Sequence, residues 1–298
     1  MSAAVFLNPA AGGGGAGRRI QEVRGAFARQ NYSATIFESR SADEFRRAIG
    51  AAKNEGFQTL IAMGGDGSLQ MLVRQVIGER FKIGVIPAGG GNDFAAALGI
   101  PKDLETAVEI LAKGKIREVD IVKVRFGNGE EAWYLGGGGM GLDAAAVSLA
   151  NRRFLNWPGR LRYLASAIAA LRGFQGVELT AEFPESGLGK FSKRVLLAAA
   201  LNTPTFGGGL RLAPEARIDD GMLEVVLLEM LSTWEVLALI PRLMVTGELR
   251  TRQIKRYRAA RIKFSAEAAP WFQGDGELLG RAPVEIAVVP RALRMLVP

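Results

Sequence analysis

Short apolar runs alternate with amphipathic stretches through the first third of the 298-residue chain. Runs of five or six apolar residues are typical of buried strands, and longer stretches with one apolar face are typical of helices. Ser41, with Glu44 three residues later, predicts a capping box at one helix start. The pattern predicts strands over residues 3–7, 33–38, 58–63 and 82–86, and helices over residues 18–30, 41–55 and 68–77, with a short helix after the fourth strand. Such alternation predicts a parallel, doubly wound sheet.

The pattern changes near residue 115, where strand-like segments begin to follow one another. The Gly127-Asn128-Gly129 turn lies between two of them and is a hairpin signal. The segments cover residues 115–126, 131–135, 177–183, 192–201, 222–230, 261–264 and 284–289. We therefore expect two domains, residues 1–120 and a mainly antiparallel domain of residues 121–289. The sequence leaves open whether residues 290–298 return to the first domain.

Two glycine-rich turns follow neighbouring strands of the predicted parallel sheet. They are Gly64-Gly65-Asp66-Gly67-Ser68 and Pro87-Ala88-Gly89-Gly90-Gly91-Asn92-Asp93-Phe94. Open α/β sheets bind ligands at the carboxyl ends of their strands, and glycines let backbone N–H groups approach an anion. An aspartate there repels phosphate unless a metal bridges the two. The pair therefore predicts a metal–nucleotide site, and tight turns that need positive φ are the simpler alternative.

The composition narrows the chemistry that such a site can perform. The chain contains no cysteine and no histidine, which excludes disulfides, a thiol nucleophile, a Ser-His-Asp triad and the usual zinc sites. Carboxylates, lysine, tyrosine and hydroxyls remain for acid–base work. Phosphoryl transfer depends mainly on positioning and charge neutralisation, so this inventory is compatible with a kinase.

The two turns also carry a resemblance to a known family. Gly-Gly-Asp-Gly-Ser followed by Pro-x-Gly-x-x-Asn-Asp-Phe resembles the catalytic domain of the diacylglycerol kinase family, which includes sphingosine, ceramide and bacterial lipid kinases. NAD kinases share the first turn but not the second. The resemblance implies an α/β fold in which a doubly wound, NAD kinase-like parallel-sheet domain precedes a mainly antiparallel β-sandwich domain. It also implies ATP and Mg²⁺ as cofactors.

Nucleotide contacts are implied at the glycine turns and at two further segments. One of these, Asn8-Pro9-Ala10-Ala11-Gly12, follows the first strand and resembles the family's first motif. The implied nucleotide-contacting residues are Asn8, Pro9, Ala10, Ala11, Gly12, Ser39, Gly64, Gly65, Gly67, Ser68, Gly89, Gly90, Gly91, Asn92 and Asp93. Asp66 is expected to engage Mg²⁺ and phosphate.

Motifs in the second domain extend the resemblance. Asn202 precedes a Gly-Gly-Gly run and an Asp-Gly-Met-Leu segment, and the resemblance implies Mg²⁺ on Asp220 with the carbonyls of Arg217 and Met222. Without the family, this segment is a turn before a strand. The Gly136–Ala144 segment is a further glycine run, for which close backbone packing and ligand contact both stay open.

The Asp275-Gly276-Glu277 turn supplies the candidate proton acceptor. Read alone, this turn is a solvated hairpin tip. Because it resembles the family's Asp-Gly-Glu motif, Glu277 is the first choice for the group that deprotonates the substrate hydroxyl, and Asp275 is the second.

The chain departs from the family at three positions near the nucleotide turns. Ser68 stands for the usual threonine, Met71 for a glutamate and Gly90 for a threonine. We expect an ATP-dependent lipid kinase that phosphorylates a primary hydroxyl of diacylglycerol, or of ceramide or a sphingoid base. The alternatives are a soluble-substrate kinase of the NAD kinase type and a nonenzymatic lipid- or nucleotide-binding relative.

The net charge of +8 favours polyanionic partners. Two groups of basic residues stand out, for which solvated surface is the default interpretation: Arg152, Arg153, Arg160, Arg162 and Arg172 around Trp157, and Arg242, Arg250, Arg252, Lys255, Arg256 and Arg258. Basic residues beside aromatic ones also suit docking on an anionic membrane. We expect a cytoplasmic protein peripherally attached to the inner face of the membrane, without nucleic acid as a partner. A homodimer is left open.

Overall fold

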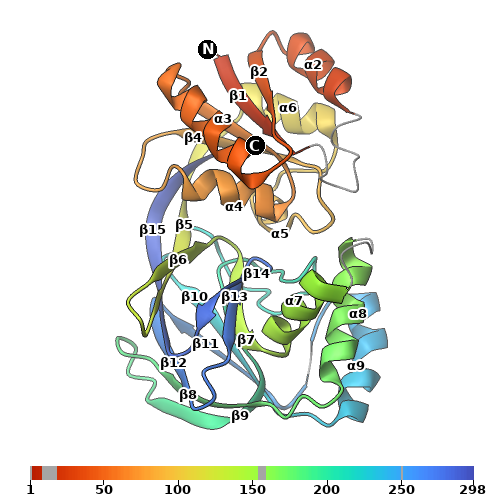
Figure 1. Ribbon diagram of the computed structural model, residues 1–298, viewed down its shortest axis with the longest axis vertical. Helices are drawn as coiled ribbons and strands as arrows, with labels where there is room; N and C mark the ends of the chain where they lie inside the picture. The colour runs from red at the N-terminus through yellow and green to blue at the C-terminus, as the bar shows by residue number, and fades with distance from the viewer. Residues whose placement is uncertain (1, 9–18, 154–158, 250) are drawn as a thin grey trace. The chain divides into compact units, whose positions relative to one another are not determined.

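The computed structural model describes residues 2–8, 19–153, 159–249 and 251–298 (Figure 1). The chain divides into two compact units, Met1–Val119 with Arg291–Pro298, and Asp120–Pro290. The C-terminal residues, which the sequence left open, therefore belong to the first unit. Two long strands, β5 (Lys115–Phe126) and β15 (Val284–Val297), contain the boundaries between the units.

The first unit is a doubly wound α/β domain. In chain order its elements are β1 (Ser2–Leu7), α2 (Ile20–Arg29), β2 (Ser33–Glu38), α3 (Ala42–Asn54), β3 (Thr59–Gly64), α4 (Asp66–Arg74), β4 (Lys82–Pro87), α5 (Asp93–Ala97) and α6 (Leu104–Lys113). The strands lie in the order β15-β4-β3-β1-β2, and each neighbouring pair is parallel. The prediction of a parallel, doubly wound sheet is confirmed.

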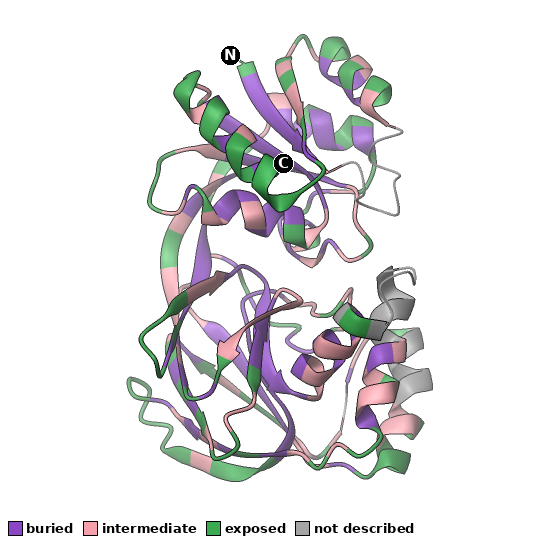
Figure 2. Ribbon diagram, in the orientation of Figure 1, coloured by how far each residue is buried: buried purple, intermediate pink, exposed green. Residues whose placement is uncertain are grey.

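Helices cover both faces of this sheet, so its central strands are buried on both sides (Figure 2). On one face, Val23 and Phe27 of α2 and Val108 of α6 pack against the strands. On the other, the ring of Phe45 in α3 lies 5.8 Å from that of Phe6 in β1. Burial on two faces explains why these strands are continuous apolar runs.

Helix capping was predicted at one helix and missed at another. The Ser41 hydroxyl accepts the N–H of Glu44 at 3.1 Å, as a capping box requires, but the Glu44 carboxylate accepts from Arg40 instead of Ser41. The sequence pattern did not predict α6. Its start has a clear signal, because the carboxylate of Asp103 accepts the N–H of Thr106 at 2.9 Å.

The second unit is mainly antiparallel. Its elements are β5, β6 (Glu131–Tyr134), β7 (Gly137–Gly141), α7 (Leu142–Arg153), α8 (Gly159–Leu171), β8 (Val177–Glu182), β9 (Lys190–Leu201), β10 (Leu223–Glu229), α9 (Thr233–Thr246), β11 (Ile254–Ala259), β12 (Arg261–Ala266), β13 (Trp271–Gly274), β14 (Glu277–Arg281) and β15. The main path is β14-β13-β7-β9-β8-β12-β15, and β10 pairs with β9 and β11. The expected antiparallel β-sandwich is confirmed.

Strand β9 separates two apolar clusters of this unit. Val195, Ala198 and Ala200 join the larger cluster, whereas Leu196 and Leu201 belong to a second cluster. The second cluster also contains Leu171 of α8, together with partly buried residues of α9. The interior of the sandwich and the helix-covered side of β9 are thus distinct cores.

The glycine run after β6 forms strand β7, which the sequence pattern did not predict. It pairs with β9 and β13. A Cβ on Gly138 would lie 2.8 Å from ring atoms of both Phe272 and Tyr134, and one on Gly137 would lie 2.6 Å from Leu201 and Phe206. Neighbouring side chains therefore occupy the space that β7 leaves empty, which gives the run a packing role.

Candidate active site

The two glycine turns lie side by side at the carboxyl edge of the parallel sheet. Gly64, the last residue of β3, pairs with Pro87 in β4, and its carbonyl accepts the N–H of Ala88 at 2.8 Å. Asp66, the middle residue of the first turn, is also the first residue of α4. Its carboxylate accepts N–H groups of the second turn from Asn92 at 2.8 Å, Asp93 at 3.3 Å and Phe94 at 3.3 Å. Asp66 therefore ties the first turn to the start of α5.

Glycine is required where the turns approach each other. A Cβ on Gly89 would collide with the Cα of Gly65 and lie 3.0 Å from the Oδ1 of Asn92. By contrast, a Cβ on Gly67 would meet nothing within 4 Å. Packing thus explains Gly65 and Gly89, while Gly67 leaves open space at the first turn of α4, as a backbone that contacts a phosphate would.

Asn92 closes the second turn on itself. Its backbone is left-handed, with φ of 62°, and its side chain is buried. The side-chain Oδ1 accepts the N–H of Gly89 at 3.2 Å, and Nδ2 donates to the Gly89 carbonyl at 2.8 Å. Both ends of its amide are used within the turn, so Asn92 shapes the loop that was predicted to bind nucleotide.

The electrostatics of Asp66 favour a positive partner. Burial and the nearby charge of Asp93 raise the pKa of the Asp66 carboxyl, against the lowering effect of its three backbone hydrogen bonds. A cation would relieve the repulsion between the two carboxylates. The residues present therefore fit the Mg²⁺ that the sequence analysis expected near Asp66.

The other predicted nucleotide residues are distributed along the same edge of the sheet. Asn8 follows β1, and the N–H of Ser39, after β2, donates to the carbonyl of Leu7 at 3.0 Å. Ser68 is buried in α4, and Gly90 is exposed in the second turn. The segment from Pro9 to Gly12 lies outside the described residues. The carboxyl ends of β1, β2, β3 and β4 thus bring together the described members of the predicted site in this unit.

Asp275 lies at the tip of the β13–β14 hairpin and fixes this tip to the backbone that leads into β7. Its carboxylate accepts the N–H groups of Leu135 at 2.7 Å, Gly136 at 2.9 Å and Gly137 at 3.1 Å. Its own N–H donates to the Gly137 carbonyl at 2.9 Å. A carboxylate that took up a proton here would weaken these bonds, which favours Glu277 over Asp275 as the proton acceptor. The role of Asp275 as the second candidate stays a prediction.

Glu277, the first choice for the proton acceptor, lies on the same hairpin. It is the first residue of β14, lies opposite Gly274 and is half-buried. The solvated-tip interpretation fails for the hairpin as a whole, because Asp275 anchors it to the start of β7. The sequence could not reveal this anchor, since Asp275 and Leu135 are 140 residues apart.

The loop predicted to hold a metal is fixed by other contacts. Asp220 accepts the N–H of Met222 at 3.1 Å and pairs with the guanidinium of Arg258 at 2.6 Å. Arg217 pairs with Asp219 at 3.4 Å. With a guanidinium already against its carboxylate, Asp220 does not fit a cation as it lies, and we derive no step from a metal there. The metal on Asp220, Arg217 and Met222 stays a prediction.

Two buried polar residues, Asp120 and Asn202, support this loop. The carboxylate of Asp120 accepts the N–H of Gly221 at 2.7 Å. The amide of Asn202 donates to the carbonyls of Asp120 at 3.2 Å and Leu135 at 2.9 Å. The signal for Asp120 was available, because it interrupts an otherwise apolar stretch of β5.

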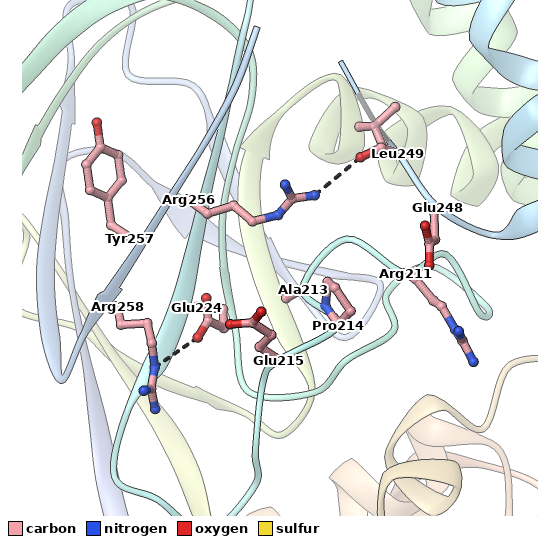
Figure 3. A pocket seen from close by; sticks show the side chains of 10 residues that line it. All are labelled: Arg211, Ala213, Pro214, Glu215, Glu224, Glu248, Leu249, Arg256, Tyr257 and Arg258. Atoms are coloured by element: carbon pink, nitrogen blue, oxygen red, sulfur yellow. Dashed lines mark hydrogen bonds and ion pairs between the residues drawn. The ribbon is translucent and has the colours of Figure 1, made fainter. Parts of the chain in front are cut away.

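A cavity of about 420 Å³ lies in the second unit (Figure 3). Its lining residues are Arg211, Ala213, Pro214, Glu215, Glu224, Glu248, Leu249, Arg256, Tyr257 and Arg258. Figure 3 shows Arg256 directed toward the carbonyl of Leu249, and Arg258 toward Glu224, with which it pairs at 2.9 Å. Basic and acidic groups offset each other here, and none of the predicted site residues lines the cavity.

The two groups of basic residues differ in their exposure and in their contacts. Arg152 and Arg172 are exposed, whereas the side chains of Arg153, Arg160 and Arg162 and all of residues 154–158 lie outside the described residues. In the second group, Arg256 and Arg258 are held by carbonyls and carboxylates of their own unit. Among the described helices, none is long and apolar enough to cross a membrane.

Comparison with known families matches both parts of the chain. The family described as "Diacylglycerol kinase catalytic domain" matches residues 2–124, and that described as "YegS C-terminal NAD kinase beta sandwich-like domain" matches residues 137–297. A protein named diacylglycerol kinase from Mycobacterium tuberculosis is 29% identical over 98% of this chain and 94% of its own length. One of the same name from Bacillus subtilis is 26% identical, over 99% and 96%.

The fold is shared with solved structures. A structure from Bacillus anthracis described as a diacylglycerol kinase covers 100% of this chain and 97% of its own, with a TM-score of 0.73 at 18% identity. The second of the two matched families alone spans more than half of the chain. The chain therefore belongs to the diacylglycerol kinase family and is a lipid kinase.

Proposed function

We propose that this enzyme transfers the γ-phosphoryl group of ATP to the primary hydroxyl of diacylglycerol, with ceramide or a sphingoid base as the next candidates. The observation that carries the proposal is the tie between the two glycine turns, in which the Asp66 carboxylate is held against Asn92 and Phe94. The relatives that match nearly the whole chain are named diacylglycerol kinases, which supports diacylglycerol as the first acceptor.

In the proposed reaction, the bond between the γ-phosphorus and the oxygen of ADP breaks as the lipid oxygen bonds to phosphorus. The hydroxyl proton passes to the carboxylate of Glu277, which the hairpin holds at the start of β14. Open backbone at Gly67 would contact phosphate oxygens. Mg²⁺, held through Asp66 and Asp93, would neutralise charge on the phosphates.

The test is an acceptor panel with ATP labelled at the γ-phosphate. Diacylglycerol, ceramide, a sphingoid base and NAD are supplied separately, the lipids in mixed micelles, and the labelled products are separated. We expect the label in phosphatidic acid. Label in NADP would instead assign the enzyme to soluble-substrate kinases of the NAD kinase type. Label in no product, with folded protein and Mg²⁺ present, would overturn the proposal.

We also propose that the enzyme attaches peripherally to the anionic inner face of the cytoplasmic membrane, where its lipid substrate lies. The net charge of +8 and the exposed Arg152 and Arg172 support this attachment. Nucleic acid is not part of the proposal, because no recognised binding module accompanies the charge.

A further inference from the structure

A hydrogen-bonded chain of side chains reaches the hairpin that carries Glu277. Gln273 lies in β13 with an exposed fraction of 1%. Its Nε2 donates to the Oδ2 of Asp143 at 2.9 Å, and its Oε1 accepts the N–H of Gly276 at 3.0 Å. Because only an oxygen can accept from Gly276, the amide has one orientation, and its donor must face Asp143.

Asp143 partners the Gln273 amide at a cost in stability, because its carboxylate is buried. It is the second residue of α7, and burial raises its pKa to about 6 despite the opposing effect of hydrogen bonds from Gln273 and from the backbone N–H groups of Ala144 and Asp143. Its Oδ1 is buried and has no hydrogen-bond partner in the described part of the chain. Burying a carboxylate that is only partly satisfied costs stability. A residue chosen for packing alone would avoid that cost.

Gly139 of the neighbouring strand β7 leaves space for the carboxylate of Asp143. A Cβ on Gly139 would lie 2.8 Å from the Oδ2 of Asp143 and 2.6 Å from the carbonyl of Ala198. Gly139 lies opposite Gln273 in the pairing of β7 with β13. The glycine therefore lets Asp143 reach the side chain of Gln273.

Hydrogen bonds hold the hairpin tip at two adjacent residues, Asp275 and Gly276. Asp275 accepts the N–H groups of Leu135, Gly136 and Gly137, which lead into β7, and Gln273 accepts the N–H of Gly276. Glu277 is the next residue along the chain. With both preceding residues fixed, the backbone from which the Glu277 side chain extends has little freedom to move.

We propose that Asp143 and Gln273 are positioning residues for Glu277: Asp143 orients the Gln273 amide, and the amide fixes the Gly276–Glu277 backbone in the geometry that proton transfer needs. The inference rests on the proposed role of Glu277 in lipid phosphorylation. A proton acceptor loses much of its effect when it is displaced by a fraction of an ångström, which gives the chain a catalytic as well as a structural consequence.

A pair of substitutions tests the direction of the hydrogen bonds. Gln273→Glu keeps an acceptor for Gly276 but removes the donor to Asp143 and sets two carboxylates against each other. Adding Asp143→Asn restores the pairing in reverse, because the new amide can donate to the new carboxylate. Tyr134→Phe is the matched control, since it removes a different buried hydrogen bond of the same unit, to the carbonyl of Ala200 at 2.8 Å.

Two readouts are measured for each protein. Hydrogen exchange of the peptide containing Gly276 reports the backbone bond, and steady-state kinetics with ATP and diacylglycerol micelles report catalysis. For Gln273→Glu we expect faster exchange and a kcat lowered about 10- to 100-fold, with the KM for ATP within about twofold of wild type. In the double variant both readouts should return to within about threefold of wild type. Tyr134→Phe should lower the melting temperature with little change in kcat.

The outcomes separate this inference from the proposed function. Unchanged exchange in Gln273→Glu would overturn the chain whatever the activity, and faster exchange with unchanged kcat would overturn the positioning role. A folded double variant that recovers neither readout would also overturn it. If Gln273→Glu does not fold, recovery of fold and kcat in the double variant supports the pairing. Wild-type protein that phosphorylates no lipid overturns the proposed function and the catalytic half of this inference, and the exchange data still decide the hydrogen-bond chain.

Discussion

The carboxylate of Asp66 accepts the backbone N–H of Asn92 at 2.8 Å, across 26 residues of sequence. This bond joins the two glycine turns whose motifs define the candidate nucleotide site. The pairing of Gly64 with Pro87 in the parallel sheet brings the turns together, and the glycines at 65 and 89 let their backbones touch. The site is therefore one preformed unit of backbone, built from two separate motifs.

We predict that Asp66→Asn lowers kcat at least about 100-fold, because a charge that would help to hold a metal and phosphate is removed. The unfolding free energy should also fall, by about 1–2 kcal/mol, because an amide cannot accept all three N–H groups. The fall in stability is limited, because asparagine carries no charge that must be buried away from water. Turnover with diacylglycerol and urea denaturation measure the two effects.

Asp43→Asn is the control for this substitution, since Asp43 is an exposed residue in the first turn of α3. It should leave kcat within about twofold of wild type and change stability by less than about 0.5 kcal/mol. A folded Asp66→Asn protein with near-wild-type kcat would remove Asp66 from the catalytic site.

We predict that Gly89→Ala separates the two turns. The added methyl group would collide with the Cα of Gly65, and backbone cannot move away as a side chain can. ATP affinity measured by calorimetry should fall about tenfold or more, and stability should fall by about 1–3 kcal/mol. Gly50→Ala, in the exposed middle of α3 with nothing within 4 Å of the new Cβ, should instead stabilise the protein by about 0.5–1 kcal/mol. Unchanged ATP affinity in Gly89→Ala would contradict the contact.

Local pattern was sufficient for much of the fold. The second strand was predicted with the bounds that β2 has, and so was β5, because apolar runs with clear turn signals are read from neighbouring residues alone. Strand β7 was missed for the opposite reason. It has no side chains except Met140, so no apolar alternation exists to detect, and only its neighbours Phe272 and Tyr134 explain it.

The candidate site was predictable as motifs but not as contacts. The turn at Asp66 was found because its glycines and aspartate are adjacent in sequence. The roles of Asp275 and Asn92 were not, because each depends on which backbone groups the fold places beside a polar side chain. Sequence reasoning identifies the residue types that chemistry needs, whereas the division between holding the loop and acting on substrate requires the structure.

We predict that stability depends on pH through Asp143. Its pKa is raised from 3.8 to about 6 in the folded protein, so between these values the folded state binds more protons than the unfolded state. The contribution of Asp143 therefore becomes less favourable as pH rises from about 4 to 6, by about 1–3 kcal/mol. Asp143→Asn removes this term.

Urea denaturation of wild type and Asp143→Asn at pH 4.5 and pH 8 measures the difference directly. The variant should gain stability relative to wild type at the higher pH, and Asp43→Asn should not. Taking the difference between proteins removes the contributions of the other carboxyls that titrate in this range, among them Asp66 and Glu224, whose pKa values burial also raises. An equal difference at both pH values would show that Asp143 titrates normally.

We predict that membrane attachment depends on the charge near α7 and α8. Reversing both Arg152 and Arg172 should weaken co-sedimentation with anionic vesicles at least about tenfold, since each basic residue near such a surface contributes about 1 kcal/mol. Reversing Arg24 and Lys102, two exposed residues of the first unit, makes the same change in net charge and is the control. Equal loss in both variants would indicate net charge alone, and equal binding of wild type to neutral vesicles would contradict electrostatic attachment.

The last prediction separates the two carboxylates of the Asp275–Glu277 turn. Asp275→Asn should lower the unfolding free energy by about 2–3 kcal/mol, because Leu135, Gly136 and Gly137 lose a charged acceptor. Glu277→Gln should keep the stability of wild type and lower kcat about 100-fold, since a loose phosphoryl-transfer transition state needs only modest help from a base. Substitution of an exposed glutamate of the same unit, Glu267→Gln, should change neither quantity.

The ATP affinity of Glu277→Gln should equal that of wild type. Its collapse in a folded protein would make Glu277 a nucleotide or metal ligand. An unchanged kcat would pass the role of proton acceptor to Asp275 or Asp66.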